Sequence, residues 1–193
     1  AVAKAKKLAE DVAAKSSAFT FGVFATGDPR IDEASRKRAA NIVGLVADVV
    51  AKGVRTPDGK PVEVVWTPVL VDGEKQADLV ARQFKAAGVG AIICAPDTWA
   101  FPQLTAISLL AQFPPDTPFN ITCGNSGPKP GVVYAHALNG ALAQMGRLAA
   151  LNVGTWPDTG DKPEMTPATA EALIDWCYAA LTHAGLRGRR VVV

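Results

Sequence analysis

The sequence lacks a charge imbalance and a long apolar run, and each absence excludes a class of protein. It has 20 lysines and arginines against 18 aspartates and glutamates, and the net charge of +2 is too small to indicate a nucleic-acid or membrane surface. No apolar stretch approaches the roughly 20 residues that a membrane-spanning helix needs. We therefore expect neither nucleic acid nor a membrane as a partner.

Cysteine and histidine are also scarce. The three cysteines, Cys94, Cys123 and Cys177, are odd in number and lack metal-ligand spacing, so we predict buried free thiols in a reducing cytoplasm. The two histidines, His136 and His183, fall inside predicted helices without a serine or cysteine partner. A structural role is favoured for both. The residues alone therefore indicate neither catalytic machinery nor a metal site in this chain.

What the sequence does contain is a regular alternation of strand-like and helix-like segments. Apolar, β-rich runs predict strands at 19–27, 62–71, 91–96 and 119–125. Helical spacing predicts helices at 31–53, 72–90, 102–113, 130–151 and 166–185. Near-continuous apolar strands that alternate with helices are typical of a parallel sheet covered on both faces. We therefore predict a Rossmann-like, three-layer α/β/α fold with a mainly parallel sheet.

A single α/β domain is expected over residues 1–193, because this length suits one sizeable core. Residues 1–17 mix charge with alanine and lack the apolar core of a signal peptide, so we expect a peripheral N-terminal helix and a cytoplasmic protein. The run RRVVV at 189–193 has the character of the first residues of a further buried strand. This indicates one domain of a longer protein.

Polar side chains follow the predicted strands at the carboxyl ends, where open parallel sheets bind ligands. Asp28 and Arg30 follow the first strand, Asp72 the second, and Asp97 and Trp99 the third. Structural roles are also open, since Asp28 can cap the next helix and Trp99 can anchor a loop. As ligand-binding groups, an arginine fork suits hydroxyls, and a tryptophan face suits the C–H face of a sugar.

The glycine-containing loops do not fit a phosphate site. The loop GNSGPKPG at 124–131, with Asn125, Ser126 and Lys129, has the spacing of neither a P-loop nor a dinucleotide fingerprint. The segment FATGDPRID at 24–32 has too few glycines. We therefore do not expect nucleotide binding, and the residues by themselves describe a binding rim without a catalytic centre.

Three motifs, in this order, resemble the L-fucose isomerase family. FGVFATGDPRIDEASR at 21–36 resembles its opening, with a strand, an Asp-x-Arg loop and a helix carrying another arginine. APDTWAFPQ at 95–103 resembles the end of the family's third strand. GNSGPKPGVVYAHALNGALAQMG at 124–146 resembles its asparagine-rich loop and alanine-rich helix. The resemblance covers about residues 20–193.

The resemblance implies that this chain is the N-terminal first domain of a three-domain, cytoplasmic, homohexameric enzyme. Such an enzyme needs Mn²⁺ and interconverts an aldose of the L-fucose or D-arabinose class and its ketose through an enediolate. The resemblance further implies that the metal ligands and the catalytic residues lie in the other domains. It assigns substrate binding to Arg30, as a hydrogen-bond donor, and to Trp99, as an apolar wall, in a pocket shared between subunits.

Two other functions stay open on the sequence. One is a sugar-binding module without catalysis, and the other is a module for oligomer assembly in which Trp99 is buried at an interface. A flavodoxin-like domain is disfavoured, because TGDPRID at 26–32 has no run of Ser, Thr and Gly suited to a phosphate.

Overall fold

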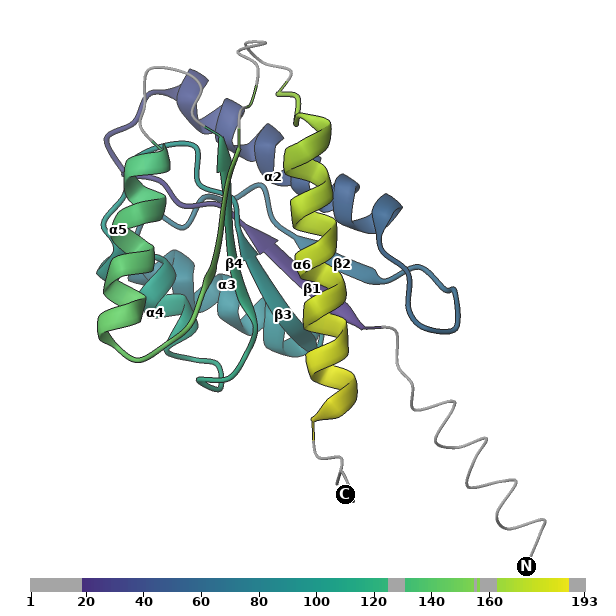
Figure 1. The fold of residues 1–193 in the computed structure, drawn as a ribbon. Helices are drawn as coiled ribbons and strands as arrows, with labels where there is room; N and C mark the ends of the chain where they lie inside the picture. The colour runs from purple at the N-terminus through teal and green to yellow at the C-terminus, as the bar shows by residue number, and fades with distance from the viewer. Residues whose placement is uncertain (1–18, 125–130, 155, 157–162, 188–193) are drawn as a thin grey trace, which may run out of the picture.

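The computed structural model describes residues 19–124, 131–154, 156 and 163–187. Three predictions lie outside these residues: the peripheral helix at 1–17, the strand at 189–193, and the polar side chains of the loop at 125–130. Figure 1 shows the arrangement of the described elements.

A five-stranded sheet forms the centre of the molecule, with all strands parallel and in the order β2-β1-β3-β4-β5. The strands are β1 (Thr20–Phe24), β2 (Glu63–Trp66), β3 (Val89–Cys94), β4 (Phe119–Gly124) and β5 (Ala150–Gly154). Strands β1 and β4 are buried throughout, as strands covered on both faces must be. The predicted parallel sheet is therefore confirmed.

Helices cover both faces of the sheet. They are α2 (Glu33–Gly53), α3 (Glu74–Ala86), α4 (Ala106–Leu110), α5 (Gly131–Gln144) and α6 (Pro167–Leu186), with a 3₁₀ turn η1 at Pro102–Leu104. The connection from β1 to β2 runs in the opposite direction to the later connections. Right-handed crossovers then place α2 on one face and α3, α4 and α5 on the other. Helix α6 lies beside α2, which completes the predicted three layers (Figure 1).

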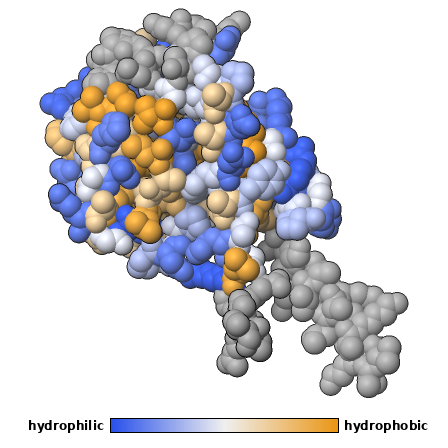
Figure 2. Space-filling model, viewed as in Figure 1, coloured by the Kyte–Doolittle hydropathy of each residue, from blue (hydrophilic) through white to orange (hydrophobic). Residues whose placement is uncertain are grey.

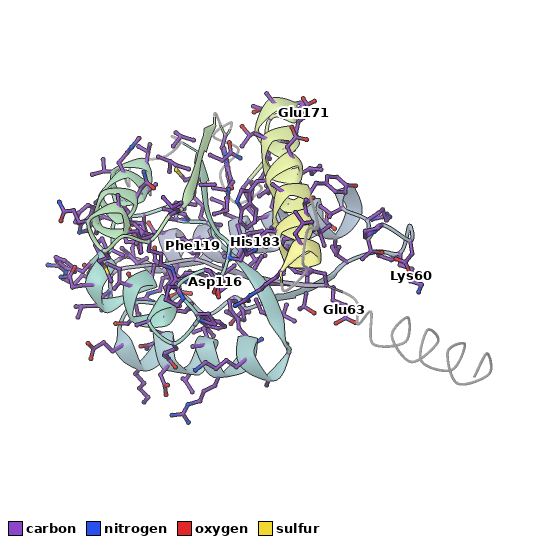
Figure 3. The ribbon with its side chains drawn as sticks, turned by 60° about the horizontal axis from the view of Figure 1, so that its bottom comes forward. Lys60, Glu63, Asp116, Phe119, Glu171 and His183 are labelled. Carbon is purple, nitrogen blue, oxygen red and sulfur yellow. The ribbon has the colours of Figure 1, made fainter. Side chains whose placement is uncertain are left out.

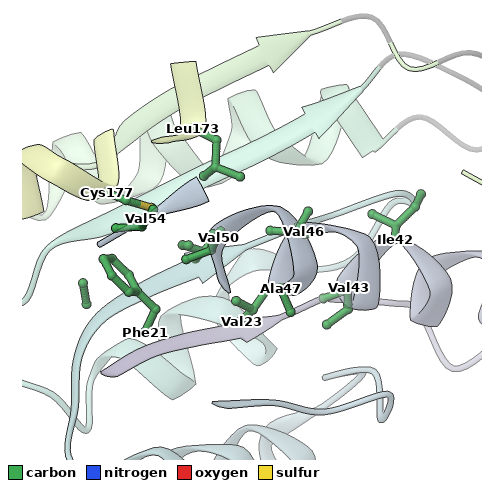
Figure 4. Packing of buried hydrophobic residues seen from close by; sticks show 14 of the residues in the cluster. Phe21, Val23, Ile42, Val43, Val46, Ala47, Val50, Val54, Leu173 and Cys177 are labelled. Carbon is green, nitrogen blue, oxygen red and sulfur yellow. The ribbon is translucent and has the colours of Figure 1, made fainter. Parts of the chain in front are cut away.

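The core consists of two clusters, one on each face of the sheet. On one face, the apolar stripe of α2 packs onto β1 and against α6, as Figure 4 shows for residues such as Val46, Phe21 and Leu173. On the other face, the Phe84 ring of α3 packs against Gly22 of β1. A Cβ atom on Gly22 would lie 2.7 Å from the Phe84 ring, so the close approach of α3 requires glycine at this position.

The sequence prediction of a single helix over 130–151 is wrong. Helix α5 ends at Gln144, and β5 follows at Ala150–Gly154. Gly146 stops the helix with a φ of 70°, in the left-handed region that glycine tolerates. The backbone N–H of Arg147 then donates to the carbonyl of Leu142 (2.9 Å). Pairing with β4 decides the structure of the following apolar segment, which has no strand pattern of its own.

All three cysteines are buried and free, as the sequence predicts. Burial raises the pKa of Cys123 to about 12 and that of Cys177 to about 12, and it also raises the pKa of Cys94. Their thiols are therefore protonated at neutral pH and act as small apolar core groups.

Candidate functional site

The sheet order fixes where a ligand can bind. The chain reverses its direction of travel between β1 and β3, and open α/β sheets bind ligands in the crevice beyond the carboxyl ends at such a point. Asp28 and Arg30 follow β1, and Asp97 and Trp99 follow β3, the strand paired with β1. The topology therefore brings both residues predicted to bind the substrate, Arg30 and Trp99, to one rim.

Asp28 holds the Arg30 side chain outward. The guanidinium donates from Nε and from Nη2 to the two Asp28 carboxylate oxygens, each over 2.7 Å, and the Arg30 backbone N–H donates to the same group (2.9 Å). The Asp28 side chain is 6% exposed, whereas that of Arg30 is 77% exposed. Hydrogen bonding from Arg30 lowers the pKa of Asp28 to about 2. The pair thus places a charged, oriented guanidinium at the surface of the rim.

Helix α2 begins directly after this pair, and its cap is Asp32. The Asp32 carboxylate accepts from the Ser35 backbone N–H (2.7 Å). Asp32 is therefore the N-cap of α2, and Asp28 forms an ion pair with Arg30. Arg36, on the first turn of α2, donates to Asp72 (3.2 Å) and to the carbonyl of Pro29 (3.0 Å). These contacts tie the loop after β2 to the loop after β1.

A cleft of about 270 Å³ opens beside Arg30. It is lined by Gly27, Asp28, Pro29, Arg30, Asp72, Phe101, Leu104 and Thr105. Phe101 is 40% exposed, and its ring centroid lies 6.0 Å from Cζ of Arg30. The cleft therefore combines charged hydrogen-bonding groups on one side with an apolar wall on the other. Its volume lies just below the range of roughly 300–1,000 Å³ that is typical of ligand pockets.

Trp99 supports this wall from behind and does not line the cleft. It is partly buried and packs edge to face with Phe101, at 6.2 Å between ring centroids, and with Tyr134 of α5, at 6.5 Å. Phe101 is the aromatic ring that the cleft exposes. The role of Trp99 as a direct substrate contact stays a prediction.

The buried partner of Asp97 is a residue that the sequence pattern did not reveal. Arg38 of α2 donates from Nε to the Asp97 carboxylate (2.9 Å), and the two side chains are only 12% and 8% exposed. The sequence places Arg38 within the apolar stripe of its helix. A charged residue in that position could have been recognised as paired, because arginine is rarely buried without a partner.

The described residues contain no group of three or more His, Cys, Asp or Glu side chains that could hold a metal ion. The aspartates after β1, β2 and β3 are each paired with an arginine. These residues therefore do not fit a Mn²⁺ centre. Nor is any helix in the described part of the chain long and apolar enough to cross a bilayer.

A larger cavity, of about 730 Å³, lies at the other end of the sheet, where β4 and β5 begin. Figure 3 turns this end forward and labels three residues that line it, Asp116, Phe119 and His183. Most of its lining is apolar, and Asp116 is engaged by Arg187 (2.8 Å). We favour the smaller cleft, because it lies at the carboxyl ends and gathers oriented polar groups.

Apolar residues also gather on the surface over α5, as Figure 2 shows. Val133 of this helix is 50% exposed, and Met145 and Leu148, which follow it, are 59% and 90% exposed. An apolar surface of this kind is typical of contacts with other protein segments and offers no groups for chemistry.

Comparisons with known proteins match this chain to L-fucose isomerases. The family model described as "L-fucose isomerase, first N-terminal domain" matches residues 18–188. An L-fucose isomerase of Vibrio vulnificus is 27% identical over 177 residues, which cover 90% of this chain and 30% of that protein. L-fucose isomerases of Phocaeicola vulgatus and Streptococcus pneumoniae are 26% and 30% identical, over 82% and 81% of this chain and 26% of each relative. The chain thus spans less than a third of the length of these curated relatives, and it belongs to the family of first N-terminal domains of L-fucose isomerases.

Proposed function

We propose that this chain is the first domain of an aldose–ketose isomerase and that it supplies part of the sugar-binding pocket. The observation that carries the proposal is Arg30, which Asp28 holds outward beside the Phe101 ring in a cleft at the carboxyl edge of the sheet. The family match and the names of the relatives support the class of reaction. The proposed substrate is an aldose of the L-fucose or D-arabinose class.

In this proposal Arg30 binds sugar hydroxyl groups. Its Nε and Nη2 atoms donate to Asp28, which leaves the Nη1 nitrogen without a partner among the described residues. Guanidinium N–H groups can only donate, so hydroxyl oxygens of a sugar are suitable acceptors. The Phe101 ring faces the same cleft and suits the C–H face of the sugar. Both residues would bind and orient the substrate, and neither is proposed to transfer a proton.

The reaction itself is proposed for the rest of the protein. The described residues do not fit a metal centre, so the Mn²⁺ that the family resemblance implies would be held by residues elsewhere in the full-length protein. We further propose a cytoplasmic homohexamer in which the Arg30 cleft completes a pocket of a neighbouring subunit. An open cleft smaller than a complete ligand site is consistent with such a shared pocket.

The experiment is an isomerase assay on the full-length gene product with Mn²⁺, using L-fucose and D-arabinose as substrates. The 193-residue chain is assayed in parallel. We expect ketose formation with the full-length protein and none with the 193-residue chain. If the full-length protein converts neither sugar, the isomerase proposal is wrong, and a non-catalytic sugar-binding or assembly module becomes the better account.

A further inference from the structure

Among the ion pairs that the described residues of the rim form, the one between Arg38 and Asp97 is the most deeply buried. Its side chains are 12% and 8% exposed, whereas those of Arg36 and Asp72 are 30% and 14% exposed. Burying two charges costs desolvation energy, and well-packed apolar residues often stabilise a fold equally well. Such a pair is therefore weak evidence for a purely stabilising role, and its surroundings indicate another.

Asp97 is held between the two helical layers. Its carboxylate accepts from Arg38 of α2 on one face of the sheet. Its backbone lies against Gly131, the first residue of α5 on the other face, where an added Cβ atom would stand 2.7 Å from the Asp97 carbonyl carbon. Trp99 follows two residues later. The ion pair thus fixes the start of the segment that carries both aromatic rings of the rim.

The end of the same segment is fixed by a second set of contacts. The Thr105 hydroxyl donates to the Phe101 carbonyl (2.8 Å) and lies 3.0 Å from the Tyr134 hydroxyl. Tyr134 is fully buried on α5, and its ring lies in a T-shaped arrangement with that of Trp99. Residues 97–101 are therefore anchored at both ends, by Arg38 of α2 at Asp97 and by Thr105, which contacts Tyr134 of α5, at Phe101.

We propose that Arg38 is a positioning residue, which acts through Asp97 to place the Phe101 ring against the sugar, with Trp99 packed behind that ring. The inference rests on the proposed function, because it assigns the aromatic wall to a sugar-binding cleft. The contact is a hydrogen bond from Nε of the planar Arg38 guanidinium to the Asp97 carboxylate. A lysine side chain has no donor at the position of Nε, so Arg38→Lys should keep the charge but restore substrate binding only in part, compared with the uncharged Arg38→Met.

The test uses the full-length protein with 5-fluorotryptophan at its tryptophans, the Trp99 resonance being assigned by Trp99→Phe. Arg38→Met removes the charge, and Arg38→Met/Asp97→Leu replaces the whole pair by apolar groups. Arg82→Met is the matched control, because Arg82 forms an ion pair with Asp78 on α3 whose side chains are 73% and 43% exposed. The readouts are KM, kcat, the melting temperature and the ¹⁹F shift of Trp99.

For Arg38→Met we expect KM to rise about tenfold with little change in kcat, because a misplaced binding group weakens binding before it alters the chemistry. Arg82→Met should leave every readout unchanged. Arg38→Met should also lower the melting temperature and displace the Trp99 resonance, because it leaves Asp97 buried without this partner. The double variant should return the melting temperature toward the wild-type value but keep the raised KM and the displaced Trp99 resonance. A double variant in which KM and the resonance return to the wild-type values together with the melting temperature overturns the proposal.

The ¹⁹F readout does not depend on activity. If the full-length protein is not an isomerase, the proposed function fails, but the Trp99 resonance still tests the placement of the aromatic wall. A Trp99 resonance that does not move in Arg38→Met or in the double variant overturns the inference. The resonances of Trp156 and Trp176, which belong to the cluster between α2 and α6, serve as internal references.

Discussion

Three arginines within residues 30–38 neutralise three aspartates that follow different strands. Arg30 pairs with Asp28 after β1, and the exposed fraction of its side chain, 77%, suits contact with a ligand. Arg36 is 30% exposed and ties the loop after β2 to this rim through Asp72. Arg38 is 12% exposed and holds the loop after β3. The degree of burial thus separates the proposed binding group, Arg30, from Arg36 and Arg38, which hold the loops in place.

The Asp28–Arg30 pair makes a prediction for acid stability. The folded pKa of Asp28 is about 2 against an ordinary value of 3.8, so the folded state binds its proton less readily than the unfolded state. The stabilisation is fully present above pH 3.8 and is lost as the pH falls toward 2. We expect Asp28→Asn to lower the free energy of unfolding at pH 6 and to approach the wild type at the acid end of this range.

Denaturant unfolding of both proteins between pH 6 and pH 2.5 measures this difference. Arg30→Met serves as a second variant, because it removes the main cause of the lowered pKa and should weaken the same pH dependence. A difference between wild type and Asp28→Asn that stays constant across the whole range would show that the pair does not titrate as described.

At the level of single residues, the sequence predicts positions better than partners. Asp28, Arg30, Asp97 and Trp99 could be placed on one rim, because the carboxyl ends of parallel strands share an edge. The buried pairing of Asp97 with Arg38 could not be predicted, because it joins residues 59 positions apart and depends on how α2 lies across the sheet. Asp28 could equally have been a helix cap until Asp32 was seen to fill that position.

Among the elements, α5 packs with its first residue directly against the backbone of the loop after β3. Gly131 lies at its first position, and a methyl group there would collide with the backbone of Asp97 and with the carbonyl of Pro96, both at 2.7 Å. Backbone atoms cannot move aside as the end of a flexible side chain can. We therefore expect Gly131→Ala to lower the free energy of unfolding by roughly 1–3 kcal/mol and to raise KM.

Gly140, on the same helix, provides the matched control. It is exposed, and a Cβ atom there would meet nothing within 4 Å. Alanine has a higher helix propensity than glycine, so Gly140→Ala should raise the free energy of unfolding by up to about 1 kcal/mol. Thermal and denaturant unfolding of the two variants measures both effects. Equal behaviour of the two substitutions would contradict the close packing at Gly131.

The predicted elements differ from the observed ones where local pattern and tertiary pairing compete. The strands β1 to β4 stand out as apolar runs, and their existence is predicted correctly. Strand β5 was missed, because its residues LNV follow a run of alanines that continues the helical composition of α5. Pairing with β4 supplies the hydrogen bonds that make this segment a strand. Gly146 is the local signal that could have separated the two elements.

For the whole molecule, alternation of strands and helices is enough to predict three layers, but not the order of the strands. The order β2-β1-β3-β4-β5 arises from one connection that runs backwards, and the crevice between β1 and β3 exists because of it. The chain corresponds to 26–30% of the length of its relatives. That the small, open cleft is completed by further parts of a longer protein stays a proposal.

The most direct test of the account is the KM for L-fucose in full-length Arg30→Met, compared with wild type. Loss of charge-assisted hydrogen bonds to a hydroxyl should raise KM roughly tenfold to a hundredfold, with kcat and bound Mn²⁺ unchanged. That result would establish this domain as a sugar-binding part of the enzyme. An active variant with the wild-type KM would contradict the account, because Arg30 would then be a surface charge with no part in the pocket.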